Sequence, residues 1–177
     1  MTRSFAWVFG VLLLQRAFEV FVSIRNRKAL EPLGAKEFHP ESFRNIAAMH
    51  ALYFVSLAVE SYPWRLPLDV RTISCLVAVA LLAGLRLWCM ASLHPYWNVR
   101  IVVVPGAHVK SSGPYRFLRH PNYLVVVLEF LFLPLLMRAP VTMVVFSVAN
   151  LFALRQRIRF EEEALRSLTD YGKVFGG

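Results

Sequence analysis

The sequence predicts an all-α, polytopic integral membrane protein with about five membrane-crossing helices. Of its 177 residues, 57% are hydrophobic, and the mean hydropathy is +0.50, which is too apolar for a soluble domain of this length. The apolar residues gather in segments that basic stretches separate. The length predicts one structural domain, in which an N-terminal three-helix region (1–91) precedes a core made of a polar loop, a helical hairpin and a terminal helix (92–177).

The predicted spans differ in length. They cover residues 4–24, 45–62, 70–91, 121–137 and 139–154. The first three approach the ~20 residues that a helix needs to cross a bilayer. The last two are shorter, with Pro134 and Pro140 on either side of Arg138, so we expect a tilted or incompletely spanning helical hairpin. The first span is expected to be a retained helix, because polar residues follow its apolar part and no small-residue cleavage site is present.

The formal net charge of +9 comes from basic residues that are distributed as this topology predicts. Most of the 20 Lys and Arg residues lie in three segments, 25–44, 86–119 and 155–173, which five spans place on one side of the membrane. By the positive-inside rule, that side is cytoplasmic. We therefore expect the N-terminus outside and the C-terminus inside, with the basic side attracted to membrane lipids and no binding of nucleic acid.

Several common catalytic motifs are absent from the sequence. The 8 glycines form neither a dinucleotide-binding nor a phosphate-binding loop. No Cys and His spacing is typical of zinc, so no metal is expected, and Ser111 and Ser112 lack the context of a nucleophile elbow. Cys75 and Cys89 lie about 21 Å apart along one predicted helix, and are interpreted as core residues rather than a disulfide.

The loop between the third and fourth spans ends in a dense polar motif. Gly113-Pro114-Tyr115 is followed by Arg119-His120-Pro121-Asn122-Tyr123, in which proline suits the first position of a helix and His120 its N-cap. Earlier in the loop, Ile101-Val102-Val103-Val104 predicts extended or shallowly buried backbone. The free N–H groups at the helix start favour an anion, and tyrosine faces can hold a flat heterocycle or a cation.

The C-terminal segment 151–171 predicts a helix that continues from the last span. Its apolar stripe consists of Leu154, Ile158, Leu165 and Leu168. Arg157 and Glu161 lie on the same stripe, one turn apart. Two explanations remain open: a helix ion pair worth about 0.2–0.5 kcal/mol, or the wall of a ligand cleft. Because a carboxylate can bind an ammonium group or ribose hydroxyls, the second explanation fits a zwitterionic cosubstrate.

The motif at 113–123, followed by a helical hairpin and by Arg157-x-x-x-Glu161-Glu162-x-x-Leu165, resembles the isoprenylcysteine carboxyl methyltransferase family. The resemblance covers roughly residues 94–171. It implies an integral membrane methyltransferase core that uses S-adenosylmethionine without a Rossmann fold. In the first half of the chain, Gln15-Arg16-x-x-Glu19 and His50 are similar to a compact bacterial branch, which implies a location in the bacterial inner membrane.

The resemblance also implies a role for individual residues. The cosubstrate S-adenosylmethionine would bind to His108, Val109, Lys110, Tyr115, His120, Pro121, Asn122, Tyr123 and Glu161. Catalytic roles fall to Arg157, which would face the acceptor, and to Arg119. The histidine of the family pattern aligns with Ala107, one position before His108.

The acceptor stays open at this point. A lipid-tailed molecule would enter from the bilayer and offer an oxygen atom. A prenylcysteine-like carboxylate needs Arg157 as an orienting cation and no base, whereas the phenol or enol of an alkylresorcinol or alkylpyrone needs deprotonation by His120 or a carboxylate. A phospholipid N-methyltransferase shares the His-Pro and Glu-Glu pattern. A non-catalytic transporter or lipid-binding protein would instead use the intramembrane charges of Arg16, Glu19 and Glu129.

Overall fold

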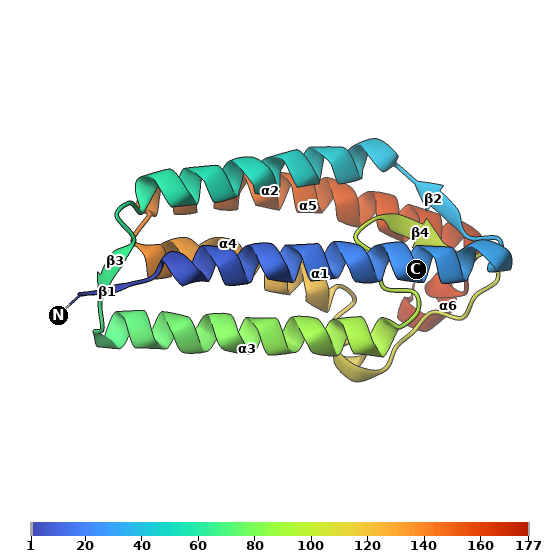
Figure 1. Cartoon of the computed structure of the whole chain (residues 1–177). Coiled ribbons are helices and arrows are strands. Elements are labelled where there is room, and N and C mark those ends of the chain that lie inside the picture. Colours follow the sequence, from blue (N-terminus) through green and yellow to red (C-terminus); the bar gives the residue numbers. More distant parts are fainter. Residues whose placement is uncertain (1, 177) are drawn as a thin grey trace.

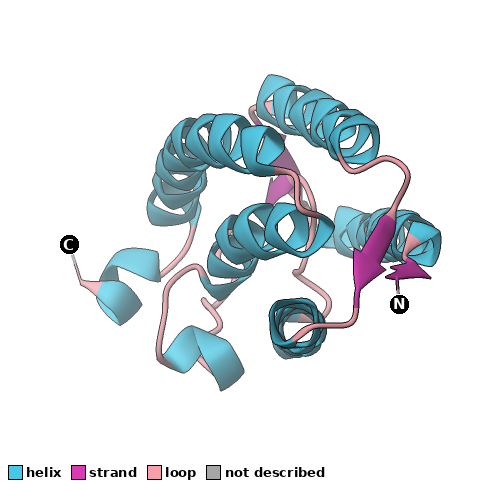
Figure 2. Ribbon diagram, turned by 90° about the vertical axis from the view of Figure 1, so that its left-hand side faces the viewer, coloured by secondary structure: helices cyan, strands magenta, loops and turns pink. Residues whose placement is uncertain are grey.

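The structure, a computed structural model, describes residues 2–176 and shows five long helices that run side by side (Figure 1). The helices are α1 (Ala6–Leu30), α2 (Pro40–Glu60), α3 (Val70–Leu93), α4 (Pro121–Met137) and α5 (Pro140–Leu168). Viewed along their axes, they form one bundle (Figure 2). The expected all-α fold is confirmed.

Helices α3 and α4 lie close to the predicted spans 70–91 and 121–137, whereas α1 and α2 are longer than predicted and α5 joins the last span to the terminal helix. Helices α1, α3 and α5 are long and apolar enough to cross a membrane, and α4 is apolar but shorter. Between α4 and α5 the chain turns at Arg138, whose φ of 57° is left-handed, which confirms the helical hairpin. Glu60 at the end of α2 accepts hydrogen bonds from the backbone N–H groups of Val141 (2.8 Å) and Thr142 (2.7 Å). These bonds cap the start of α5 and tie the hairpin to α2.

Short strands join the loops at both ends of the bundle. Strand β1 (Thr2–Ser4) pairs antiparallel with β3 (Arg65–Pro67) at the end that carries the N-terminus. At the other end, β2 (Lys36–Phe38) pairs antiparallel with β4 (Ile101–Val103) (Figure 1). Of the segment 101–104, expected to be extended or shallowly buried, residues 101–103 form this strand, for which the sequence predicted no partner. We call this second end the β4 end.

The three basic segments meet at the β4 end, as the predicted topology requires. The first loop holds the 3₁₀ turn η1 (Glu31–Leu33) and β2, and the long loop holds β4 and the 3₁₀ turn η2 (Gly113–Arg116). After α5, the chain ends in the short helix α6 (Tyr171–Phe175). The backbone N–H of Gly106 in the long loop donates to the carbonyl of Leu168 at 2.7 Å. This bond joins the long loop to the end of α5, where the C-terminal tail (169–176) begins.

Helix α1 continues beyond the expected boundary at residue 24. Its last turns are polar, but they have partners in the loop that follows α3. Ser23 Oγ donates to Asn98 Oδ1 at 3.0 Å, and Asn26 Nδ2 donates to the carbonyl of Trp97 at 2.8 Å. Because these buried polar groups are satisfied by the protein, the helix extends to Leu30.

The apolar core fills the end of the bundle near the N-terminus. It includes Phe5 directly before α1, Leu12 of α1, and Leu133 and Met137 of α4. Tyr53 of α2 packs there against α4. Towards the β4 end the interior contains buried polar and charged side chains, beside a smaller apolar cluster of Ile101, Val103 and Ala164.

Four charged side chains lie between α1, α3 and α4, and we call them the four-charge cluster: Arg16, Glu19, Arg86 and Glu129. Arg16 contacts Glu19 at 2.7 Å and Glu129 at 2.8 Å. Arg86 contacts Glu129 at 2.5 Å and Glu19 at 3.3 Å. Glu19, Arg86 and Glu129 are each no more than 5% exposed. Two positive charges therefore meet two negative charges inside the bundle.

The position of Arg86 corrects one part of the sequence analysis. Arg86 was expected at the edge of the basic loop, where it would contribute to the orientation of the chain. Instead it lies buried within α3, because the carboxylates of Glu19 and Glu129 on two other helices pair with it. Hydropathy along a single helix cannot reveal such partners.

Removing one member of the four-charge cluster should destabilise the whole bundle. In Glu129→Ala, the two arginines share a single carboxylate, and breaking a buried ion pair from one side costs about 3–5 kcal/mol. We expect a clearly lower Tm in thermal unfolding of the detergent-solubilised protein. The matched control is Glu163→Ala on the exposed side of α5, which should change Tm little. Equal effects of the two variants would contradict the structural role of the cluster.

Candidate active site

A cavity of about 230 Å³ lies at the β4 end and extends towards the middle of the bundle. Its outer wall comes from the long loop, the start of α4, the second half of α5 and the tail. Its inner wall includes His50 of α2 and three members of the four-charge cluster, Arg16, Glu19 and Arg86. One cavity thus connects the polar motifs of the loop and tail with charges deep in the bundle.

The structure brings the predicted site residues together around this cavity. Those that line it are His108, Val109, Lys110, Tyr115, Arg119, His120, Asn122, Tyr123, Arg157 and Glu161. Pro121 is buried at the first position of α4, where it starts the helix and does not line the cavity. Ala107 lines it beside His108. The individual roles of these residues remain predictions.

The hydroxyl of Tyr123 lies at the centre of the site. It accepts a hydrogen bond from Arg157 Nε at 3.0 Å and donates one to the carboxylate of Glu161. Arg157 and Glu161 are therefore joined through a third side chain and form no direct ion pair within the described chain. The sequence left two explanations open for Arg157 and Glu161: a helix ion pair, or the wall of a ligand cleft. The geometry favours the second explanation.

The guanidinium of Arg157 is held in place from two sides. Besides its bond to Tyr123, its Nη2 donates to the carbonyl of Val99 at 2.6 Å. Its Nη1 is buried and has no hydrogen-bond partner among residues 2–176. Asn122 Oδ1 on α4 is likewise buried without a partner there. A buried polar atom without a partner is unfavourable, so Arg157 and Asn122, which both line the cavity, each keep one unsatisfied polar atom.

His120 belongs to a second network, which includes residues that the sequence analysis did not assign to the site. Its Nε2 lies 3.0 Å from Glu162 Oε1, which also accepts a hydrogen bond from the hydroxyl of Tyr171 at 2.9 Å. Burial opposes ionisation of Glu162, but the bonds from His120 and Tyr171 outweigh it and lower its pKa. Burial and the bond to Glu162 raise the pKa of Tyr171. Glu162 is therefore an anion that holds His120 towards the tail.

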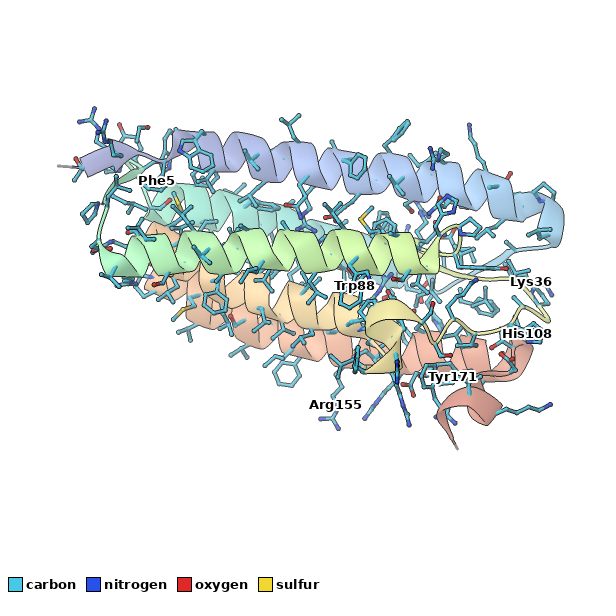
Figure 3. The ribbon with its side chains drawn as sticks, turned by 90° about the horizontal axis from the view of Figure 1, so that it is seen from below. Phe5, Lys36, Trp88, His108, Arg155 and Tyr171 are labelled. Carbon is cyan, nitrogen blue, oxygen red and sulfur yellow. The ribbon has the colours of Figure 1, made fainter. Side chains whose placement is uncertain are left out.

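Asp170 connects the loop at 107–110 with the tail and was also missed. Its carboxylate pairs with His108 Nδ1 and accepts a bond from the backbone N–H of Val109, both at 2.8 Å. These two contacts lower the pKa of Asp170. The His108 side chain itself is 95% exposed, at the same end of the molecule as Tyr171 (Figure 3). The partners of Asp170 lie about 60 residues away in the chain, so local pattern could not reveal them.

The start of the polar motif at 113–123 is fixed by a close approach between η2 and α3. Gly113 has a φ of +59°, and a Cβ atom there would lie 2.3 Å from Ser92 Oγ and 3.2 Å from Trp88 Nε1. Only glycine both adopts this positive φ easily and lacks the Cβ atom that would collide with α3. This contact seats Tyr115 against α3, where burial raises the pKa of its phenol. Tyr115 is thus an uncharged aromatic wall of the cavity.

Arg119 lies at the mouth of the cavity, beside the end of the chain. Its Nη2 donates to the carbonyl of Phe175 at 2.7 Å, and its guanidinium lies 5.9 Å from the centre of the Phe175 ring. In contrast to Arg157, which is 5% exposed, this arginine is open to solvent. The two arginines predicted to be catalytic therefore lie at different depths.

Replacing Asp170 should loosen the contact between the loop and the tail. Asp170→Asn keeps the shape of the side chain but removes the charge that pairs with His108, so hydrogen exchange of segment 106–110 should accelerate at pH 7. Because the folded pKa of Asp170 is lowered, the wild-type contact persists at and above the ordinary Asp pKa of 3.8 and is lost as the pH falls below it. Lys173→Gln on α6 is the control, and acceleration there too would contradict the role of Asp170.

Comparisons with known proteins show the family to which this chain belongs. The model of the isoprenylcysteine carboxyl methyltransferase (ICMT) family matches residues 73–167. The uncharacterized protein YpbQ of Bacillus subtilis is 38% identical over 157 residues, which cover 89% of this chain and 94% of that protein. An uncharacterized protein of Haemophilus influenzae is 25% identical over 161 residues, covering 90% and 94%. No solved structure matches. The chain belongs to the isoprenylcysteine carboxyl methyltransferase family, a family of membrane-embedded methyltransferases.

Proposed function

We propose that the protein is a membrane methyltransferase that uses S-adenosylmethionine to methylate an oxygen atom of a lipid-tailed acceptor. The observation that carries this proposal is the pair of unpartnered polar atoms in the cavity, Arg157 Nη1 and Asn122 Oδ1. A ligand that carries both an acceptor and a donor could satisfy these two atoms. Because the chain belongs to a family of methyltransferases, the reaction class is methyl transfer.

The outer part of the cavity has the groups that S-adenosylmethionine requires. Its ammonium group or its ribose hydroxyls would bind to Glu161, and Asn122 Oδ1 would accept a hydrogen bond from one of its N–H groups. Its carboxylate would lie near the N-terminus of α4, where the helix dipole favours an anion. Tyr115 offers a face for the adenine ring. No metal takes part in this proposal.

Arg157 would orient the acceptor. S-adenosylmethionine supplies a methyl group activated by a positively charged sulfur, so the protein mainly needs to align the two reactants, which can contribute up to about 7–11 kcal/mol. The bonds to Tyr123 and Val99 fix the guanidinium, and the remaining Nη1 would donate to the acceptor oxygen. An amine acceptor has no use for this donor and is repelled by its charge, which favours O-methyl over N-methyl transfer.

A lipid tail suits the middle of the cavity. Between the polar outer part and the four-charge cluster, the lining includes Ile46, Val126 and Leu154 from three helices. Many outward-facing side chains of α1, α3 and α5 are large and apolar, as expected for helices surrounded by lipid. We propose that the acceptor reaches the cavity from the bilayer, while the cosubstrate enters at the β4 end.

Glu161 and Arg157 should affect different steps. Glu161→Gln should weaken the binding of S-adenosylhomocysteine, measured by calorimetry in nanodiscs, because a neutral amide cannot pair with an ammonium group. Arg157→Ala should leave that affinity within about twofold. It should reduce methyl transfer to membrane lipid extract by 10-fold or more, since one lost donor in a buried site is worth about 1.5–3 kcal/mol.

Both variants have matched controls on α5. Glu163→Gln and Arg155→Ala change exposed residues of the same types, and Arg155 points away from the bundle (Figure 3). Unchanged affinity in Glu161→Gln would remove this residue from the cosubstrate site. Equal transfer by the Arg157 and Arg155 variants would refute the proposed contact with the acceptor.

We further propose that the β4 end faces the cytoplasm of a bacterial cell, where S-adenosylmethionine is made. The clustering of basic segments at this end supports the proposal. A reporter enzyme that is active only in the cytoplasm should be active when fused after residue 177 and inactive when fused before residue 1. The opposite pattern would place the active site on the other side of the membrane.

A further inference from the structure

Four consecutive residues between η2 and α4 are exposed, and the proposed function does not use the middle two. They are Arg116-Phe117-Leu118-Arg119, which we call the 116–119 segment. Phe117 is 73% exposed and Leu118 is 47% exposed, although exposed apolar surface is unfavourable in water. Large apolar side chains next to arginines are typical of a segment that lies at the surface of a membrane.

The helix lengths show where the edge of the bilayer lies. The starts of α3 and α5 are at one level, because Arg138 before α5 pairs with Asp69 at the N-cap of α3, at 2.6 Å. From its first residue to Trp88, α3 rises about 27 Å, and α5 rises about as far to Arg159. This rise is close to the ~30 Å thickness of the hydrocarbon core. Trp88 and Arg159 therefore lie near the boundary at the β4 end.

The 116–119 segment lies at this boundary. It follows Gly113, where a Cβ atom would be 3.2 Å from Trp88 Nε1. Trp88 is 50% exposed near the end of α3 (Figure 3), and tryptophan is enriched at membrane interfaces. On α5 the exposed side chains change from apolar at Phe152 to basic at Arg155. Two helices thus mark the same level, and the segment lies beside one of them.

The two arginines of the segment form no ion pair within residues 2–176. Arg116 lies over the ring of the neighbouring Phe117, 5.9 Å from its centre, and Arg119 donates to the carbonyl of Phe175. Glu162 contacts the histidine that follows the segment, and its other ion pair is with an arginine of α5. Both guanidinium groups can therefore bind an anion outside the protein, and their geometry matches that of a phosphate.

We propose that the 116–119 segment is a binding site for the headgroups of anionic phospholipid in the surrounding bilayer. The arginines donate to phosphate oxygens, and Phe117 and Leu118 insert between the acyl chains. A lipid satisfies both kinds of side chain, whereas a soluble phosphate satisfies only the arginines. Because Arg119 also lines the cavity, the bound headgroup lies at the mouth of the cavity. This inference goes beyond methyl transfer and does not depend on it.

A fluorescent label tests the insertion of the segment. In Leu118→Cys, bimane attaches to the new thiol alone, since Cys75 and Cys89 are buried. In nanodiscs of phosphatidylcholine that is brominated along its acyl chains, the bimane emission should fall at least about twofold, because interfacial side chains reach ~5–10 Å into the boundary of headgroups and acyl chains. The same label in Lys173→Cys, at an exposed position of α6, should keep its emission. Equal quenching at the two positions would overturn the insertion.

The same label tests the preference for an anionic headgroup. A minor fraction of brominated phosphatidylglycerol in phosphatidylcholine should quench bimane more strongly than the same fraction of brominated phosphatidylcholine. We expect a ratio of about fivefold, which corresponds to the attraction of one arginine to an anionic surface. Arg116→Gln should lower this ratio, and Arg116→Gln combined with Arg119→Gln should bring it close to one. Equal quenching by the two lipids without these substitutions would overturn the inference.

Matched variants separate a local site from the general attraction of a basic protein. Arg25→Gln combined with Lys28→Gln removes two exposed charges from the end of α1 and should leave the ratio unchanged. An equal loss in both double variants would assign the preference to net charge and overturn the local site. The side chain of Arg116 makes no hydrogen bond within residues 2–176, so Arg116→Gln keeps the fold. An unchanged ratio in this variant would also overturn the inference.

Soluble anions test the choice of partner. Sodium chloride and inorganic phosphate at equal ionic strength should lower the ratio equally, through screening. A loss caused by phosphate alone would assign the segment to a soluble phosphate and overturn the inference. These measurements involve neither S-adenosylmethionine nor methyl transfer. Failure of the proposed function would therefore leave this inference standing, and failure of this inference would leave the proposed function standing.

Discussion

The arrangement of the bundle depends on the pairing of Arg16 and Arg86 with Glu19 and Glu129. Isolated charges inside an apolar bundle would be strongly unfavourable, but each carboxylate here contacts both arginines. The pairing joins α1, α3 and α4 at one level and forms the inner wall of the cavity. It also makes that wall polar without giving it a net charge. The inner boundary of the cavity therefore depends on this pairing.

A second constraint acts at the β4 end, where loop and tail must close over the same cavity. Tyr123 joins Arg157 to Glu161, and Glu162 and Asp170 attach the tail to His120 and to the loop. Most of these contacts connect segments that are distant in the sequence. They form the polar outer part of the cavity, where we propose that the cosubstrate binds, whereas the proposed lipid-tailed acceptor would occupy the deeper part. This division fits a transfer between a soluble and a lipid-tailed molecule.

The sequence predicted what depends on local pattern. Hydropathy located the helices and the hairpin, and helical spacing placed Arg157 and Glu161 on one face of α5. It did not predict the bridge through Tyr123, the pairing of His120 with Glu162, or the contact between Asp170 and Val109, because each joins different elements. The burial of Arg86 was missed for the same reason. The pairing of β2 with β4 was missed because strands of three residues carry too little pattern.

Direct photolabelling of the protein by S-adenosylmethionine tests the central claim, that one cavity at the β4 end holds the methyl donor. The protein in nanodiscs would be irradiated with radiolabelled S-adenosylmethionine, and the labelled peptides would be mapped by mass spectrometry. The account predicts saturable labelling within 107–123 and 157–175, which excess S-adenosylhomocysteine abolishes. Labelling that does not saturate, or that is confined to helices outside the cavity, would contradict it.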